Sequence, residues 1–145
     1  MPILDRSRYA SAEGLRRGGY VLADPEGGDP EVILIATGSE VALAAAAHEQ
    51  LASEGVRSRV VSLPCWELFE RQERSYRDEV LPPEITARVS IEEASTLGWD
   101  RFVGEDGVTI GMHTFGSSAP LRDVQTKFGF TPDRVAEAAK EVLYR

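Results

Sequence analysis

The chain has 145 residues, enough for one domain with a buried core, and a formal net charge of −8. This charge disfavours binding to nucleic acid or to anionic membranes, and no apolar run approaches membrane-spanning length. The single cysteine, Cys65, excludes an internal disulfide framework and favours a cytoplasmic location.

The first segment differs in character from the rest of the chain. Residues 1–17 are polar with little periodicity, so we expect a linker or arm from an upstream domain, followed by an α/β domain over residues 18–145. Tyr20–Ala23 is a short strand candidate, and residues 24–30 are strongly turn-forming. Because no crossover helix separates this strand from the next, we expect it to be an antiparallel edge strand.

The most apolar stretch of the sequence is Val32–Ala36. An unbroken apolar run predicts a strand covered on both faces, as in parallel sheets flanked by helices. An alanine-rich helix is predicted directly after it, with Ser39 as its N-cap and Gly55 at its end. His48 lies on the apolar face of that helix, where we expect it to pack.

The remaining elements alternate between strands and helices. Further strands are predicted at residues 56–63, 85–91 and 108–112, with Arg57 and Arg59 making the start of the first of them solvated. Helices are predicted within residues 66–76 and 96–102, over residues 119–128, and from Pro132 onward with Thr131 as N-cap. The pattern predicts an α/β fold: a three-layer α/β/α sandwich with a mostly parallel sheet of about five strands and one antiparallel edge strand.

The carboxyl ends of parallel strands meet at one edge of a sheet, where ligands usually bind. The residues just past the predicted strands are Ser39, Glu40, Cys65, Glu92, Glu93 and His113. From this edge we select a candidate cleft or interface formed by Gly38, Ser39, Glu93, His113 and Phe115.

Each member of this set also has a structural interpretation. The turn at Gly38 and Ser39 is too short for a phosphate-binding loop, and Glu40 would repel a phosphate there. Glu92 and Glu93 are adjacent on a strand, so their side chains point to opposite faces and cannot form a carboxylate dyad.

A nucleophile and base could be formed by Cys65 and His113, but no third residue to orient the histidine can be named. The spacing of histidines and cysteines fits no metal site. The sequence therefore assigns no catalytic, cofactor-binding or metal-binding residue.

An ordered set of six segments resembles the carboxyl-terminal, third domain of transketolase. They are residues 17–22 (RGGYVL), 35–41 (IATGSEV), 59–64 (RVVSLP), 98–99 (GW), 115–120 (FGSSAP) and 128–131 (FGFT). The resemblance covers nearly the whole chain, and its specificity lies in the order of the segments.

This resemblance implies a complete enzyme that transfers a two-carbon ketol unit between sugar phosphates in the pentose phosphate pathway. Thiamin diphosphate and a divalent metal would be bound by two preceding domains, whose motifs cannot be matched here, so we expect no cofactor on this chain and no activity from it alone. The expected role is domain packing and dimerisation. The expected partners are the upstream thiamin-diphosphate-binding domains, in the same protein or in a split-gene partner chain, and a second copy in a homodimer.

Two other functions stay open. One is a small-molecule or nucleotide-binding regulatory module that uses the carboxyl edge near Gly38, Glu93 and His113. The other is a hydrolase built on Cys65 and His113.

Overall fold

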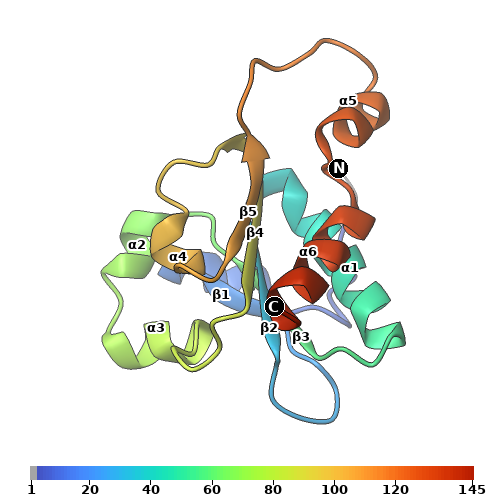
Figure 1. Ribbon diagram of the computed structural model, residues 1–145. Helices are drawn as coiled ribbons and strands as arrows, with labels where there is room; N and C mark the ends of the chain where they lie inside the picture. The colour runs from blue at the N-terminus through green and yellow to red at the C-terminus, as the bar shows by residue number, and fades with distance from the viewer. Residues whose placement is uncertain (1–2) are drawn as a thin grey trace.

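The computed structural model describes residues 3–145 and shows a five-stranded sheet between two helical layers (Figure 1). The strands are β1 (Tyr20–Ala23), β2 (Val32–Ala36), β3 (Ser58–Ser62), β4 (Arg88–Ser95) and β5 (Val108–Met112). They lie in the order β1-β3-β2-β4-β5. β1 pairs antiparallel with β3, and the other three pairings are parallel. The predicted fold class, including the antiparallel edge strand, is confirmed.

The helices divide between the two faces of the sheet. One face is covered by α1 (Val41–Ser53) and α6 (Pro132–Leu143). The other is covered by α2 (Trp66–Glu70), α3 (Arg74–Val80) and α4 (Asp100–Val103). Figure 1 shows α5 (Leu121–Phe128) beyond the end of the sheet, after a loop that rises from β5. Two 3-10 turns, η1 (Ala12–Arg17) and η2 (Gly38–Glu40), precede β1 and α1.

The apolar run of β2 forms the centre of the core. All five of its residues are fully buried, because β2 lies between β3 and β4 and has helices over both faces. Leu34 packs in the cluster on the α1 and α6 side, and its neighbour Ile35 packs in the cluster on the opposite side. The alternation of a strand thus divides one apolar run between two cores.

The core under α2, α3 and α4 is rich in aromatic rings. Both tryptophans of the chain lie there, with the Trp66 and Trp99 ring centroids 5.0 Å apart in an edge-to-face arrangement. Phe102 and Phe69 extend the cluster. Such pairs add to the stabilisation from burial alone.

One local prediction is wrong, and another holds only in part. Ser39 is not the N-cap of α1, because η2 intervenes and the Ser39 hydroxyl donates to the Glu40 carboxylate instead of accepting from a helical N–H. Just before β3, Arg57 is solvated as predicted, with a side chain that is 43% exposed. Arg59 is not: its side chain is only 13% exposed, and its guanidinium pairs with Asp24 and donates to the Glu79 carbonyl. An arginine stem packs on apolar surface when its head group finds such partners.

Two helix boundaries agree with the patterns, and one strand is shifted. Gly55 has a φ of +80° just after α1, as its stop role requires, and Thr131 Oγ1 accepts from the Arg134 N–H 3.2 Å away to cap α6. β4 begins at Arg88, three residues later than predicted, and continues past Glu93.

Candidate functional site

The strand-to-helix corner at residues 37–40 is tied to the neighbouring strand. Glu40 is only 4% exposed, and its Oε2 accepts from the Glu93 backbone N–H at 3.2 Å. The other carboxylate oxygen accepts from Ser39 Oγ. Gly38, by contrast, is exposed, with a φ of +59° and open space where a side chain would begin. The buried carboxylate therefore serves an internal contact, and only Gly38 and Ser39 face outward at this corner.

The two glutamates of β4 diverge, as adjacent strand residues must. Glu92 Oε2 accepts from Trp99 Nε1 at 2.9 Å on the α4 side of the sheet. Glu93 Oε1 accepts from Gln125 Nε2 of α5, also at 2.9 Å. Each carboxylate has one side-chain hydrogen bond within the chain, so their geometry is that of structural contacts.

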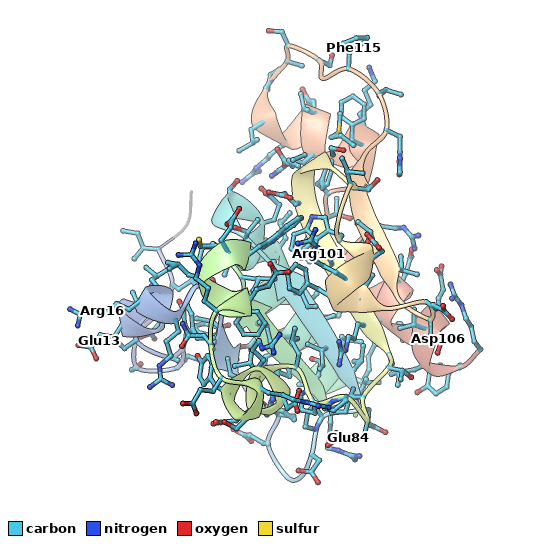
Figure 2. All side chains as sticks on the ribbon, turned by 90° about the vertical axis from the view of Figure 1, so that its left-hand side faces the viewer. Glu13, Arg16, Glu84, Arg101, Asp106 and Phe115 are labelled. Carbon is cyan, nitrogen blue, oxygen red and sulfur yellow. The ribbon has the colours of Figure 1, made fainter. Side chains whose placement is uncertain are left out.

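His113 and Phe115 belong to the loop that rises from β5, which we call the projecting loop (residues 113–120). His113 is exposed and Phe115 is 98% exposed. Figure 2 shows Phe115 at the outer end of this loop, away from the body of the molecule. Leu121, which begins α5, is 61% exposed. The structure thus separates these two candidates from the corner at Gly38 and places an apolar side chain in solvent.

The proposed cysteine–histidine pair is not assembled. Cys65 follows β3 and His113 follows β5, and two strands lie between them in the sheet. At about 4.8 Å per strand, three steps separate these strands by roughly 14 Å. The Cys65 thiol instead lies 3.6 Å from Glu67 Oε2, a carboxylate that cannot act as the activating imidazole.

An open groove of about 440 Å³ lies beside the corner. Its walls include the corner, at Gly38 and Ser39, the segment of residues 3–15, and side chains at the ends of β1, β3 and α1. Glu93 and His113 are not among its lining residues. The groove is lined mainly by apolar atoms, which suits an apolar group better than a phosphorylated one.

A second groove, of about 650 Å³, lies on the α1 side and was not predicted. In it Glu49 receives hydrogen bonds from Arg8 and Tyr9, which are 41 and 40 residues away in sequence. These bonds lower the pKa of Glu49, while burial and the bond to Glu49 raise the pKa of Tyr9. No periodicity or motif marks such a contact, so sequence reasoning had no signal for it.

His48 lines the same groove and is half-buried. Its Nδ1 lies 2.8 Å from Ser58 Oγ at the start of β3. Burial lowers the pKa of His48, because the charged imidazolium loses solvation there. The packing role predicted for His48 thus includes a polar contact.

Within residues 3–145, no cluster of three or more His, Cys, Asp or Glu side chains is arranged to hold a metal ion. In the same part of the chain, no helix has the length and apolar character needed to cross a membrane.

Comparison with known proteins agrees with the resemblance. A family model described as the transketolase-like C-terminal domain matches residues 18–131. The chain belongs to this family. Transketolase of Aquifex aeolicus is 50% identical over 138 residues, which cover 95% of this chain and 20% of that protein. Transketolase of Geobacillus stearothermophilus is 45% identical over 143 residues, covering 99% and 21%.

The chain spans about a fifth of the length of these curated relatives and matches the C-terminal part of transketolases. Among solved structures, transketolase from Leishmania mexicana superposes with a TM-score of 0.83 at 38% identity, over 92% of this chain and 19% of that chain. A split-gene transketolase described as an inactive β4 tetramer superposes with a TM-score of 0.67 at 25% identity, over 88% and 43%.

Proposed function

We propose that this chain is the non-catalytic C-terminal domain of a thiamin-diphosphate-dependent transketolase, and that it acts in domain packing and dimerisation. The observation that carries the proposal is the match to about the last fifth of transketolases, together with a carboxyl edge whose carboxylates are engaged in internal hydrogen bonds. The partners would be the upstream thiamin-diphosphate-binding domains, in the same protein or in a separate chain, and a second copy of the enzyme.

The projecting loop supports a packing role. An apolar ring that is 98% exposed costs solvation free energy unless another surface covers it. Phe115 projects at the end of the molecule where the loop rises (Figure 2), and Leu121, at the start of α5, is a second exposed apolar side chain. The neighbour described as a β4 tetramer also contains this fold in an assembly.

A chimera tests the proposal with a complete enzyme. The chain would replace the matching C-terminal fifth of Aquifex aeolicus transketolase, and turnover and sedimentation would be measured. We expect a dimeric, active chimera, and a smaller dimer fraction when Phe115→Ser is introduced. Tyr144→Ser is the control, because Tyr144 is 74% exposed but lies at the end of α6. Equal dimer fractions in the two variants would contradict the role of the loop.

The non-catalytic part of the proposal has its own test. The 145-residue chain, incubated with thiamin diphosphate, Mg²⁺ and ketose and aldose phosphates, should show no ketol transfer, with circular dichroism confirming that it is folded. Measurable transfer by this chain would overturn the assignment.

A second candidate is a small-molecule-binding module, favoured by the 440 Å³ groove beside Gly38 and Ser39. Titration calorimetry with sugar phosphates, nucleotides and small apolar ligands would detect it. Ser39→Trp should abolish any binding by filling the groove. A heat of binding that is unchanged in this variant would mean that the ligand binds elsewhere.

A further inference from the structure

β1 is the antiparallel edge strand of the sheet, and its outer side carries backbone groups that do not pair with β3. Such an edge can accept another strand, which in solution leads to association between chains. One outward group is already occupied: the Leu22 carbonyl accepts from the Ala10 N–H at 2.9 Å. Ala10 therefore stands where the backbone of an added strand would lie.

Ala10 ends a short segment, residues 3–10, which we call the strap. Its turn is set by Asp5, whose carbonyl accepts from the N–H groups of Arg8 and Tyr9. Arg6 donates to the Ala10 carbonyl at 2.7 Å, and Leu4 and Tyr9 pack against the core on the α1 side. The strap thus has a defined conformation and apolar contacts with the domain.

The strap is followed by η1, which is anchored separately. The Gly18 carbonyl accepts from the Cys65 N–H at 2.9 Å, and the Arg17 guanidinium lies over the Tyr76 ring at 4.5 Å. Figure 2 shows Glu13 and Arg16 on the outer side of η1, pointing away from the body. With η1 fixed, loss of the strap contacts would release residues 3–10 alone.

The polar contacts between the strap and α1 meet at one side chain, Glu49. Arg8 Nη2 donates to both carboxylate oxygens of Glu49, at 2.6 and 2.7 Å, and Tyr9 Oη donates to Glu49 Oε1 at 2.9 Å. Charge-assisted hydrogen bonds are stronger than neutral ones, although the partial exposure of this pair reduces their contribution. Glu49 is therefore the residue whose removal should loosen the strap with least effect on the core.

We propose that residues 3–10 guard the edge of the sheet: the strap occupies the outer side of β1 within the same chain, and its contact with Glu49 keeps it there. When the strap leaves, the outer edge of β1 is open to an extended strand, and the strand available in a solution of this protein is β1 of a second copy. The guard therefore suppresses edge-to-edge association, which is separate from the packing proposed for the projecting loop.

The test compares Glu49→Ala with Glu54→Ala in the 145-residue chain. Glu54 lies immediately after α1 and also accepts from a cation, Lys140 at 2.7 Å, but that contact holds α6. In Glu49→Ala we expect hydrogen exchange of the Ala10 amide to accelerate by about 1.5- to fivefold, the range for one partly exposed ion pair. In Glu54→Ala the Ala10 amide should exchange as in the parent chain. Equal rates in the two variants would overturn the role of Glu49.

Sedimentation over a concentration series tests the guard itself. Ala10→Pro removes the N–H that Leu22 binds without altering any charge, so it and Glu49→Ala should both increase concentration-dependent association. Adding Phe115→Ser should leave that increase unchanged, because the loop is not involved. Release of the strap, seen by exchange, without greater association than in Glu54→Ala would overturn the proposal.

Discussion

His48 shows how one residue links burial to pH. In the folded chain its pKa is lowered, chiefly by burial, while neighbouring Glu49 and Asp24 act in the opposite direction. In the unfolded chain it returns to about 6.5. As the pH falls below about 6.5 the unfolded chain takes up this proton first, so the free energy of unfolding decreases until the folded pKa is passed.

We therefore expect the free energy of unfolding of the His48→Gln variant to depend less on pH in this range. Urea denaturation of the parent chain and the variant at several pH values between 8 and 5 would measure it. The stability lost between these limits should be smaller in His48→Gln, whereas the titration of carboxylates affects both chains. A parallel decline in the two chains would contradict the burial of the imidazole.

At the scale of single elements, glycines at the ends of turns fix how the chain enters a strand or helix. Gly18, after η1, and Gly38, in η2, both have positive φ values, of 79° and 59°. A side chain at Gly38 would meet open space, whereas at Gly18 its Cβ would lie within 2.4 Å of the Cys65 carbonyl and the Phe69 N–H nitrogen. The two positions share a backbone conformation and differ in packing.

Gly18→Ala should consequently destabilise the chain more than Gly38→Ala. The left-handed conformation alone costs about 1–2 kcal/mol, which we expect for Gly38→Ala. Gly18→Ala adds a clash with backbone of α2 that no side-chain rotation relieves. Thermal unfolding of both variants would rank them, and similar losses would mean that η1 moves away from α2 at little cost.

Elements were predictable where one local pattern determines them. The apolar run of β2 predicted its burial on both faces, and the missing crossover before it predicted the antiparallel position of β1. The role of Ser39 was not predictable, because it depends on Glu40 turning inward to reach the Glu93 N–H on another strand. A cap pattern describes only the nearest turn of the chain.

The candidate site was less predictable than the fold. The predicted strand end before Gly38 matches the structure, whereas Glu93 lies within β4 and not beyond its end. The sequence also does not specify that Gln125 binds Glu93 or that Phe115 projects into solvent. The contact of Arg8 with Glu49 joins residues 41 positions apart and has no sequence signal. Contacts of this kind arise from the packing of elements and leave no periodicity.

At the scale of the whole molecule, the two helical layers share β2. Leu34→Ala removes volume only from the core on the α1 and α6 side, and we expect a loss of about 2–5 kcal/mol in the free energy of unfolding. Because the same strand also carries Ile35 into the opposite core, the molecule should still unfold in one transition. Fluorescence and far-ultraviolet circular dichroism should then give the same shifted midpoint, and divergent midpoints would indicate that the layers unfold separately.

The position of the two tryptophans has a practical consequence. Trp66 and Trp99 share one aromatic cluster on the α2 to α4 side, so the tryptophan emission of the native protein comes from that half alone. Movements of the strap, of α1 or of the projecting loop would leave the tryptophan emission unchanged until the whole chain unfolds. A tryptophan introduced at Phe115 would give the projecting loop its own signal. Its emission should shift to shorter wavelength when another protein surface covers the loop.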